Sequence, residues 1–306
     1  MNPRIKVVGV GGSGSNTVAR IAKFDVKGVQ LVAVNTDAQA LHFCHVEHKL
    51  LIGKNTTKGL GAGMDVTQGE LAAQESIQEI TEMLKGLDMV FITCGFGGGT
   101  GSGAGPVIAK IAHDLGILTV AVITTPFSFE GAERKKIADN AIRQLQGKVD
   151  SLLVISNDNL LKIIDETTTV SNAFEICDDV AKQAVQSITD LILAPGIINV
   201  DFASLISIMK NSGRALFGVG RAHGSNRAIQ AATQAISSPL LDFSIKGSKG
   251  VLFNASGSDI TLQEIQEAAK IITENVEAQA QIIFGAVKDA SLKKGEIKIT
   301  VIATKF

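Results

Sequence analysis

Short apolar segments that alternate with helical patterns constrain the fold of this chain more than any other feature. The apolar segments lie at residues 5–10, 29–34, 89–93, 118–123 and 152–155. Between them, apolar residues recur at helical spacing in residues 16–24, 70–84, 107–115 and 132–145. Strands that are apolar at nearly every position are buried on both faces, which is typical of a parallel sheet covered by helices. We therefore predict a Rossmann-like α/β domain in the first half of the chain.

A glycine-rich turn follows two of these predicted strands. Residues 9–14 read GVGGSG after the strand at 5–10, and residues 95–103 read GFGGGTGSG after the strand at 89–93. The carboxyl ends of parallel strands lie at one edge of the sheet, where helix N-termini and free backbone N–H groups attract anions. Glycine lets those N–H groups approach an oxygen without a Cβ in the way. The two turns together predict a pocket for several negative charges, such as a triphosphate.

The first turn by itself permits two other interpretations. It matches G-x-G-x-x-G between a strand and a helix, and Asp37 follows the second strand at the distance typical of an NAD site. It is also compatible with a purely structural turn. The second glycine-rich turn argues against both alternatives. No G-x-x-x-x-G-K-[ST] run is present, so backbone dipoles and a metal ion must meet the phosphate charge.

The second half of the chain has a different pattern. Apolar residues recur every three or four positions over residues 173–192, until Pro195 and Gly196 end the helical pattern. Strand-like runs at 215–219, 250–255, 280–286 and 297–303 then surround helical patterns at 227–236 and 261–276. We predict a nucleotide-binding domain over residues 1–170, a central helix over 171–195 and a smaller mixed α/β domain over 196–306.

Charge and cysteine content exclude several classes of protein. With a net charge of −1, the chain lacks the basic field that nucleic-acid binders use, and we expect no nucleic-acid partner. Cys44, Cys94 and Cys177 are odd in number and far apart, which favours buried thiols in a reducing compartment. No apolar run approaches the roughly 20 residues that a bilayer requires. We expect a cytoplasmic protein without direct membrane insertion.

Three histidines close in sequence raise the question of a zinc site. His42, His45 and His48 are spaced so that a helix would spread them around its circumference, and a predicted strand begins at Lys49. A polar junction between a helix and a strand is the simpler explanation. We assign no metal-ligating residue.

Residues 98–103 (GGTGSG) are similar to the glycine-rich signature of the tubulin/FtsZ family. Six further motifs fall in the family's order and spacing, so that the resemblance covers essentially the whole chain. They are residues 11–16 (GGSGSN), 35–41 (NTDAQAL), 59–63 (GLGAG), 126–131 (PFSFEG), 156–158 (SND) and 199–203 (NVDFA). The chain length and the runs PFSFEG and NTDAQAL resemble the FtsZ branch more than eukaryotic tubulin.

The resemblance implies a cell-division GTPase that forms head-to-tail filaments, and it implies roles for particular residues. Two groups would hold the phosphates, with Ala62 and Gly63 near the γ-phosphate, Glu130 and Arg134 at the ribose and phosphates, and Arg20 reaching the base. Phe174, Asn157 and Asp178 would contact guanine. The phosphate-binding groups are Gly11, Gly12, Ser13, Gly14, Ser15 and Asn16 with Asn35, and Gly95, Gly97, Gly98, Gly99, Thr100 and Gly101.

Two of these assignments have support from the residues themselves. A carboxylate can accept from both N1–H and the N2 amino group of guanine, so Asp178 suits GTP over ATP; the alternative is a solvated helix face shared with Asp179. Glu130 and Arg134 are four residues apart and share a helix face directed at the loop above.

The resemblance also places catalysis in a second part of the chain. The loop at residues 196–205 would dock on the nucleotide of the next subunit, where Asn199 and Asp201 match the family's motif. Ser204 stands where the family usually has a second acidic residue. A serine can orient water but cannot accept its proton at neutral pH. An alternative is therefore a GTP-binding filament or scaffold protein with slow hydrolysis.

Cofactors and partners follow from the same resemblance. It implies GTP and GDP with Mg²⁺, leaves K⁺ as an open alternative, and makes the chain its own partner in a longitudinal homopolymer. Division proteins and membrane adaptors would join it in the cytoplasm, at a ring at the division site.

Overall fold

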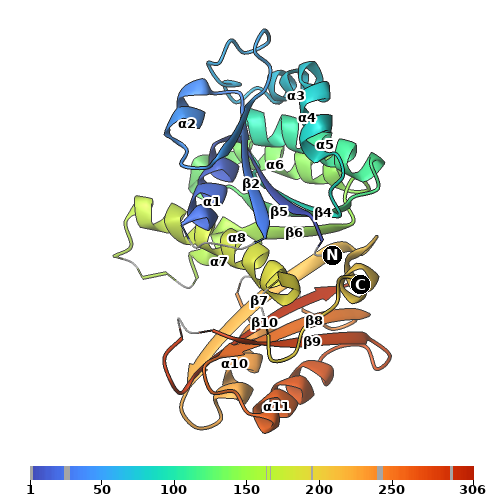
Figure 1. Ribbon diagram of the computed structural model, residues 1–306. Helices are drawn as coiled ribbons and strands as arrows, with labels where there is room; N and C mark the ends of the chain where they lie inside the picture. The colour runs from blue at the N-terminus through green and yellow to red at the C-terminus, as the bar shows by residue number, and fades with distance from the viewer. Residues whose placement is uncertain are drawn as a thin grey trace. The chain divides into compact units, whose positions relative to one another are not determined.

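The computed structural model describes residues 3–23, 28–162, 164–165, 167–193, 196–239, 244–289 and 292–306. The chain divides into two compact units, Met1–Gln186 and Ser187–Phe306, and each is described by itself (Figure 1). The predicted division at residues 170 and 195 stays a prediction. Its end at Pro195, and the end of the first predicted helix at Phe24, lie outside the described residues.

The first unit contains a sheet of parallel strands in the order β3-β2-β1-β4-β5-β6. This order is that of the Rossmann fold, in which ligands bind where the order of strands reverses, here between β1 and β4. The predicted fold class is therefore confirmed for this unit. The strands are β1 (Ile5–Val10), β2 (Val29–Asn35), β3 (His48–Leu51), β4 (Met89–Gly95), β5 (Leu118–Thr125) and β6 (Ser151–Ser156).

Helices cover this sheet because its strands are apolar on both faces. The helices are α1 (Gly11–Ala22), α2 (Ala38–Phe43), α3 (Val66–Glu75), α4 (Ile77–Leu84), α5 (Gly99–Asp114), α6 (Ala132–Leu145) and α7 (Asn157–Leu160), with the 3₁₀ turn η1 (Ser128–Glu130). α3, α4, α5 and α6 share one buried apolar core with β1, β2, β4 and β5. α1 packs on the sheet with a separate buried set that includes Val18 and Ile21. The helix α8 (Val170–Leu193) begins in this unit and ends in the second.

The single helix predicted over residues 70–84 is wrong, because the structure has two helices that meet at Ser76. Ser76 leaves the helical conformation and its hydroxyl oxygen accepts from Gly53 N at 3.1 Å. Next to it, the Glu75 carboxylate accepts from the backbone N–H groups of Asn55 and Thr56, both at 2.9 Å. Contacts with a distant loop therefore interrupt a helix that local spacing would continue.

The helix predicted over residues 107–115 is too short. α5 begins at Gly99, inside the glycine run, although glycine disfavours a helix interior. A Cβ at Gly99 would lie 2.7 Å from Asp65 O, and one at Gly103 would lie 2.2 Å from Val66 O. The backbone of α5 thus packs directly on the start of α3, and tertiary contact overrides helix propensity.

The second unit contains a mixed sheet in the order β7-β10-β8-β9, as the predicted smaller α/β domain requires. β10 pairs antiparallel with β7 and β8, and β8 pairs parallel with β9. The strands are β7 (Gly213–His223), β8 (Gly250–Gly257), β9 (Gln281–Lys288) and β10 (Glu296–Thr304), and the helices are α9 (Phe202–Met209), α10 (Arg227–Ile236) and α11 (Leu262–Thr273). α10 and α11 share a buried core with one face of this sheet.

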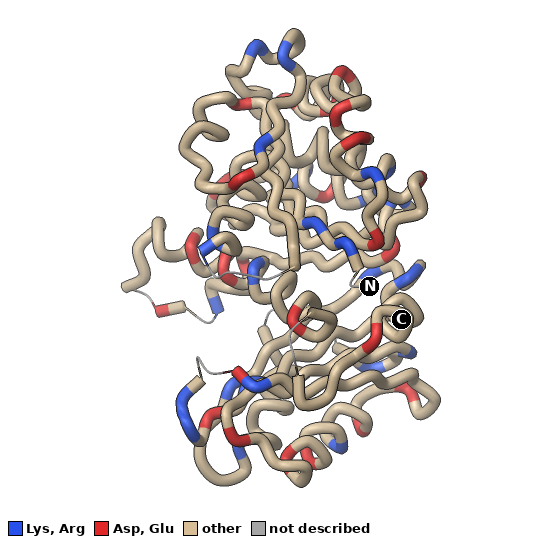
Figure 2. The backbone as a smooth tube through the Cα atoms, viewed as in Figure 1, with Lys and Arg blue, Asp and Glu red and all other residues tan. Residues whose placement is uncertain are grey.

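Charged side chains of both signs are interspersed along both units (Figure 2). None of the described helices is both long enough and apolar enough to cross a membrane. The three cysteines are free and buried, as predicted.

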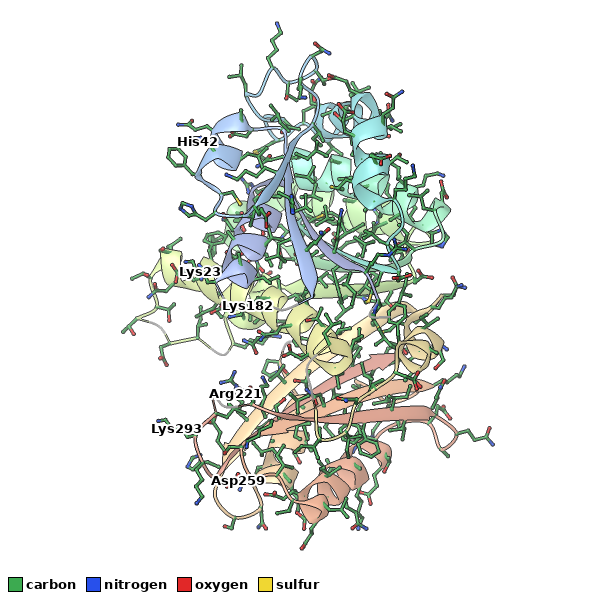
Figure 3. All side chains as sticks on the ribbon, in the orientation of Figure 1. Lys23, His42, Lys182, Arg221, Asp259 and Lys293 are labelled. Atoms are coloured by element: carbon green, nitrogen blue, oxygen red, sulfur yellow. The ribbon has the colours of Figure 1, made fainter. Side chains whose placement is uncertain are left out.

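Arg227, the first residue of α10, forms ion pairs with Asp259, which precedes α11, and with Glu264 in α11. It is 7% exposed. Its Nη1 donates to Asp259 Oδ1 at 2.8 Å, and its Nε donates to Glu264 Oε1 at 2.5 Å (Asp259 is labelled in Figure 3). The guanidinium lowers the pKa of the Asp259 and Glu264 carboxyls.

Replacing Arg227 by Met should lower the free energy of unfolding by about 2–4 kcal/mol, because two carboxylates lose a buried partner. Urea unfolding at neutral pH measures this difference. Both carboxyl pKa values are lowered in the folded state, so their contribution is present above their unfolded values and is lost as the pH falls through the folded ones. The difference should therefore shrink on acidification. Lys270→Met is the control, since the Lys270–Glu274 pair is exposed and its loss should cost under about 0.5 kcal/mol.

Candidate functional site

The candidate site lies in the first unit, at the carboxyl ends of β1 and β4. Val10 and Cys94 are register partners there, and the chain enters α1 and α5 just beyond them. The two glycine-rich turns are in contact, since a Cβ at Gly11 would lie 3.0 Å from Gly101 N, and one at Gly101 would lie 3.6 Å from Val10 O. The predicted meeting of the two turns is thus observed.

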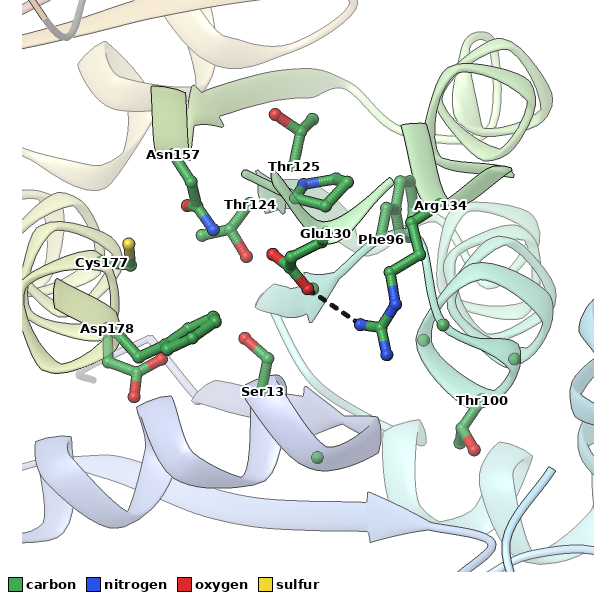
Figure 4. A pocket seen from close by; sticks show the side chains of 17 residues that line it. Ser13, Phe96, Thr100, Thr124, Thr125, Glu130, Arg134, Asn157, Cys177 and Asp178 are labelled. Atoms are coloured by element: carbon green, nitrogen blue, oxygen red, sulfur yellow. Dashed lines mark hydrogen bonds and ion pairs between the residues drawn. The ribbon is translucent and has the colours of Figure 1, made fainter. Parts of the chain in front are cut away.

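A cavity of about 250 Å³ lies between these turns and α8 (Figure 4). This volume is slightly below the range of roughly 300–1,000 Å³ typical of small-molecule sites, and the cavity is open to solvent on one side. Twelve residues predicted from sequence line it: Gly12, Ser13, Gly95, Gly98, Gly99, Thr100, Gly101, Glu130, Arg134, Asn157, Phe174 and Asp178.

The N-termini of α1 and α5 open on this cavity without the usual capping. The cap positions, Val10 and Gly98, make no side-chain hydrogen bond to the helix, and neither first turn contains an acidic residue. The first N–H groups of a helix carry a partial positive charge and need acceptors. An anion in the cavity would satisfy them, as phosphates do at other helix N-termini.

The glycines of the two turns have two different purposes. Gly95 is required by packing, because a Cβ there would lie 2.6 Å from Ser13 Cβ. At Gly12 and Gly98, a Cβ would have nothing within 4 Å. Both line the cavity, so their missing side chains leave space for a ligand.

Asn157 and Asp178 lie at the end of the cavity next to α8, where Cys177 also lies (Figure 4), and Phe174 of α8 lines the cavity too. Asn157 Oδ1 is buried and has no hydrogen-bond partner among the described residues. Phe174 packs edge-on against Phe127, with ring centroids 5.3 Å apart. A flat ligand with hydrogen-bond donors on its edge would suit this end of the cavity.

The Asp178 carboxylate is buried, and the positive charge of Arg20 offsets part of the cost of burying its negative charge. Burial raises the pKa of its carboxyl to about 6, although Arg20 opposes the shift. Arg20 Nε donates to Asp178 Oδ2 at 3.3 Å, and Arg20 Nη2 lies 3.6 Å from Glu175 Oε1. Burial together with the neighbouring Asp178 charge raises the pKa of the Cys177 thiol to about 12, so that thiol stays neutral.

Glu130, the last residue of η1, and Arg134, in the first turn of α6, form an ion pair, although they do not share one helix as their spacing predicts. Arg134 Nη1 donates to Glu130 Oε2 at 2.9 Å, and Glu130 Oε1 accepts from Phe127 N at 2.9 Å (Figure 4). The pair presents both a carboxylate and a guanidinium to the cavity.

Nine predicted residues do not line this cavity: Gly11, Gly14, Ser15, Asn16, Arg20, Asn35, Ala62, Gly63 and Gly97. Asn16 and Arg20 line a neighbouring cavity that shares Asp178 with the first one. Ser15 is buried, and its Oγ has no partner in the described part of the chain. The predicted contacts of these nine residues with a nucleotide stay predictions.

The other predicted residues that do not line the cavity lie beside the glycine-rich turns or shape the backbone near them. Asn35 Oδ1 accepts from Thr36 N at 2.8 Å and so shapes the end of β2. Gly97 N donates to Ser102 Oγ at 2.9 Å, within the α5 turn. A Cβ at Gly99 would lie 2.9 Å from Ala62 Cβ, which places the 59–63 segment beside the start of α5. Gly11 and Gly63 have positive φ.

Sequence reasoning missed five lining residues: Phe96, Thr124, Thr125, Pro126 and Cys177. Thr124 and Thr125 end β5, which neighbours β4. The carboxyl end of a predicted neighbouring strand was the signal that could have found them. Cys177 precedes Asp178 on α8 and had no signal of its own.

The predicted catalytic residues lie in the second unit. Asn199 Oδ1 accepts from Gly196 N at 2.8 Å, and Asp201 caps α9 by accepting from Ser204 N at 2.6 Å. The prediction that residues 196–205 form a loop is wrong from Phe202 onward, where α9 begins. The run from Phe202 to Met209 is only eight residues long, which is shorter than the window over which helical periodicity is counted, so its helix was not recognised from the sequence.

The acidic residue of the NAD interpretation, Asp37, has a structural role. Asp37 caps α2 by accepting from Ala40 N at 3.0 Å. In the part of the chain that the structure describes, no three His, Cys, Asp or Glu side chains are grouped so as to hold a metal ion.

The Rossmann strand order and a glycine-walled cavity at its switch point define an α/β protein with an anion-binding site at the carboxyl edge of a parallel sheet. Comparison with protein families makes the class specific. Residues 4–165 match the GTPase domain of the tubulin/FtsZ family, and residues 213–306 match the C-terminal domain of the FtsZ family.

Individual relatives agree with the family match. The cell division protein FtsZ of two strains of Caulobacter vibrioides is 49% identical over 306 residues, which cover 99% of this chain and 60% of the relative. An empty FtsZ dimer from M. jannaschii is 41% identical, with a TM-score of 0.95 over 99% of this chain and 88% of the other. The GTPγS-bound protofilament of CetZ2 from Haloferax volcanii shares the fold at 21% identity, with a TM-score of 0.84 over 99% and 92%.

The chain belongs to the tubulin/FtsZ family, on the FtsZ branch, as the sequence motifs imply. It spans about 60% of the length of the Caulobacter relatives. The match to a GTPase domain argues against the NAD alternative, and family membership gives no support to slow hydrolysis over an active GTPase.

Proposed function

We propose that this chain is a cell-division GTPase that binds GTP in the cavity of its first unit, polymerises head to tail and hydrolyses GTP at the subunit interface. The observation that carries the proposal is the cavity itself. Two uncapped helix N-termini open on one end of it, Asn157 and Asp178 lie at the other end, and Phe174 lines it too.

The cavity can bind the nucleotide through the chain's own groups. The first N–H groups of α1 and α5 donate to phosphate oxygens, and Arg134 adds a positive charge. The edge of guanine presents N1–H and N2–H donors, which Asp178 accepts, and Asn157 Oδ1 gains the donor it lacks. Adenine has no such pair of donors, so the site discriminates in favour of GTP.

Mg²⁺ fits the chemistry of the lining. Ser13, Thr124 and Glu130 offer oxygen atoms of the kind that Mg²⁺ prefers, and this ion commonly binds through few protein ligands together with phosphates. When bound, the ion would neutralise charge on the phosphates. No residue is assigned to K⁺.

Hydrolysis requires a group that orients or deprotonates water. In this proposal the 196–205 segment of the next subunit supplies it, with Asp201 as the carboxylate and Asn199 shaping the segment through Gly196. Such a group contributes roughly 10²–10⁴ in rate. The family's partners, a homopolymer together with division proteins and membrane adaptors at a cytoplasmic division ring, are part of the same proposal.

The nucleotide that co-purifies with the chain tests the proposal directly. Chromatography should identify GDP or GTP, and right-angle light scattering should rise when GTP and Mg²⁺ are added. A chain that binds neither guanine nucleotide at millimolar concentration would remove the proposal, and NAD in its place would restore the first-turn interpretation.

Replacing Gly98 by Ala should weaken GDP binding about tenfold, or about 1.4 kcal/mol. Gly98 has φ −103° and ψ 175°, which any residue adopts, and a Cβ there meets open space in the cavity. The empty variant should therefore unfold at the wild-type temperature. Gly95→Ala is the matched comparison, because its Cβ would collide with Ser13 and should lower the unfolding temperature as well. Unchanged affinity in Gly98→Ala would mean that phosphates do not approach this turn.

A further inference from the structure

Two threonine hydroxyls meet just beyond the end of β2, at the first turn of α5. Thr36 Oγ1 and Thr100 Oγ1 are 2.7 Å apart, and the distance alone allows either to be the donor. Their surroundings differ. Thr100 lines the cavity, whereas Thr36 is 0% exposed.

Burial decides the direction of this hydrogen bond. Each hydroxyl has one proton, and Thr100 is the partner of the Thr36 hydroxyl within the described residues. If Thr100 donated, the Thr36 proton would be buried without an acceptor, which is costly. The Thr100 proton has no such problem, because water or a ligand in the cavity can accept it. Thr36 is therefore the donor, and the proton of Thr100 is left for the cavity.

Hydrogen bonds to the backbone N–H and carbonyl groups of Thr36 hold this residue in place. Its N–H donates to Asn35 Oδ1 at 2.8 Å, and its carbonyl oxygen accepts from Thr57 Oγ1 and Gly61 N, both at 3.2 Å. Its branched side chain has few rotamers to exchange. Thr36 thus joins the 57–61 segment to the first turn of α5, and its hydroxyl has a defined direction.

We propose that Thr36 is a positioning residue of the nucleotide site, which orients the Thr100 hydroxyl so that it donates to a phosphate oxygen. The proposal rests on the proposed function, because the acceptor is a phosphate of the bound nucleotide. A donor oriented before the ligand arrives loses less freedom on binding, and so contributes more to affinity. Thr36 needs no contact with the nucleotide to have this effect.

The matched variants Thr36→Ser and Thr36→Ala test this proposal. Both remove the methyl group, and they differ by the one oxygen that donates to Thr100. Isothermal titration with GDP and with GTP should find Thr36→Ser within twofold of wild type and Thr36→Ala about five- to tenfold weaker. In a Thr100→Ala background the difference between Ser and Ala at position 36 should fall below twofold, because the group that Thr36 orients is gone. If Thr36→Ala does not fold, Thr36→Val supplies the variant without the oxygen.

The outcomes separate this inference from the proposed function. If the wild-type chain binds no guanine nucleotide, the proposed function is wrong. Wild type that binds, with Thr36→Ser and Thr36→Ala equal within twofold, defeats the role of Thr36 alone. A difference that persists in the Thr100→Ala background would show that Thr36 acts by a route other than Thr100, and would overturn the proposal.

Discussion

Replacing Asp201 by Asn is expected to slow GTP hydrolysis about 10²–10⁴-fold and to leave GTP binding within about twofold. Asp201 Oδ1 caps α9 through Ser204 N, and an Asn side chain can accept the same hydrogen bond, so the fold should persist. A carboxamide cannot take a proton from water. Phosphate release under conditions that support polymerisation measures the rate, and titration of GTP measures the binding.

The charge state of Asp201 sets the pH range of this test. Hydrogen bonds from Ser204 and Ala203 lower the pKa of its carboxyl, so the carboxylate persists to a lower pH than for an ordinary aspartate. Any stability that this group contributes is present above its unfolded pKa and is lost as the pH falls through the folded one. Assays at neutral pH therefore compare a full carboxylate with an amide.

Mixed filaments distinguish action on a neighbour from action within one subunit. Asp201→Asn provides an intact cavity, whereas Gly98→Ala provides an intact 196–205 segment. If Asp201 acts on the neighbour's GTP, the mixture should hydrolyse faster than the sum of its components. A purely additive mixture, or an Asp201→Asn variant with wild-type turnover, would contradict the proposed role of Asp201.

Replacing Asp178 by Asn is expected to weaken GDP and GTP binding about 10- to 100-fold, since charge-assisted hydrogen bonds contribute about 1.5–3 kcal/mol. The amide presents an N–H group where guanine also has a donor. Xanthine has a carbonyl at C2 instead, so the variant should gain relative affinity for xanthosine nucleotides. Competition between GDP and xanthosine diphosphate on wild type and variant measures this change in preference.

The neighbouring residue supplies the control for Asp178. Asp179 is half-exposed, and its Oδ1 lies 3.0 Å from Lys182 Nζ. Asp179→Asn should bind guanine nucleotides as the wild type does. Equal effects of the two substitutions would favour the interpretation of both residues as a solvated helix face.

The raised pKa of Asp178, about 6, also predicts a pH dependence. GDP affinity of the wild type should fall as the pH drops below about 6, because the carboxyl takes up a proton, and this fall should be absent in Asp178→Asn. The stability of the nucleotide-free protein should depend on pH in the opposite direction. The folded pKa is above the unfolded one, so the folded state binds more protons between them and stability falls as the pH rises through that window. Empty Asp178→Asn should therefore be at least as stable as wild type at pH 7.5.

Much of the first unit could be predicted from the sequence because its signals are local. Residues 5–10, 29–34 and 89–93 are apolar, short and followed by turns, and each is a strand of the sheet. Glycines at 11–14 and 95–101 mark turns that any parallel sheet places at one edge. Seven predicted residues of these turns line the cavity for this reason, and the five others that line it were assigned through the family resemblance.

The remaining features depend on contacts between segments that are distant in sequence. The break at Ser76 requires Gly53, and the early start of α5 requires the backbone of Asp65 and Val66 beside its glycines. Local spacing contains neither partner, so it predicted one long helix and one short one.

The sequence by itself determined the parallel sheet, the two glycine-rich turns and membership of the tubulin/FtsZ family, because strand burial, turn chemistry and motif order are all written along the chain. Only the tertiary structure decided that α1 and α5 present uncapped N-termini to one cavity, that Asp178 is buried beside Arg20, and that the hydroxyls of Thr36 and Thr100 share a hydrogen bond. The direction of a hydrogen bond and the pKa of a carboxyl depend on what surrounds the group in space, and the surrounding residues come from distant parts of the sequence.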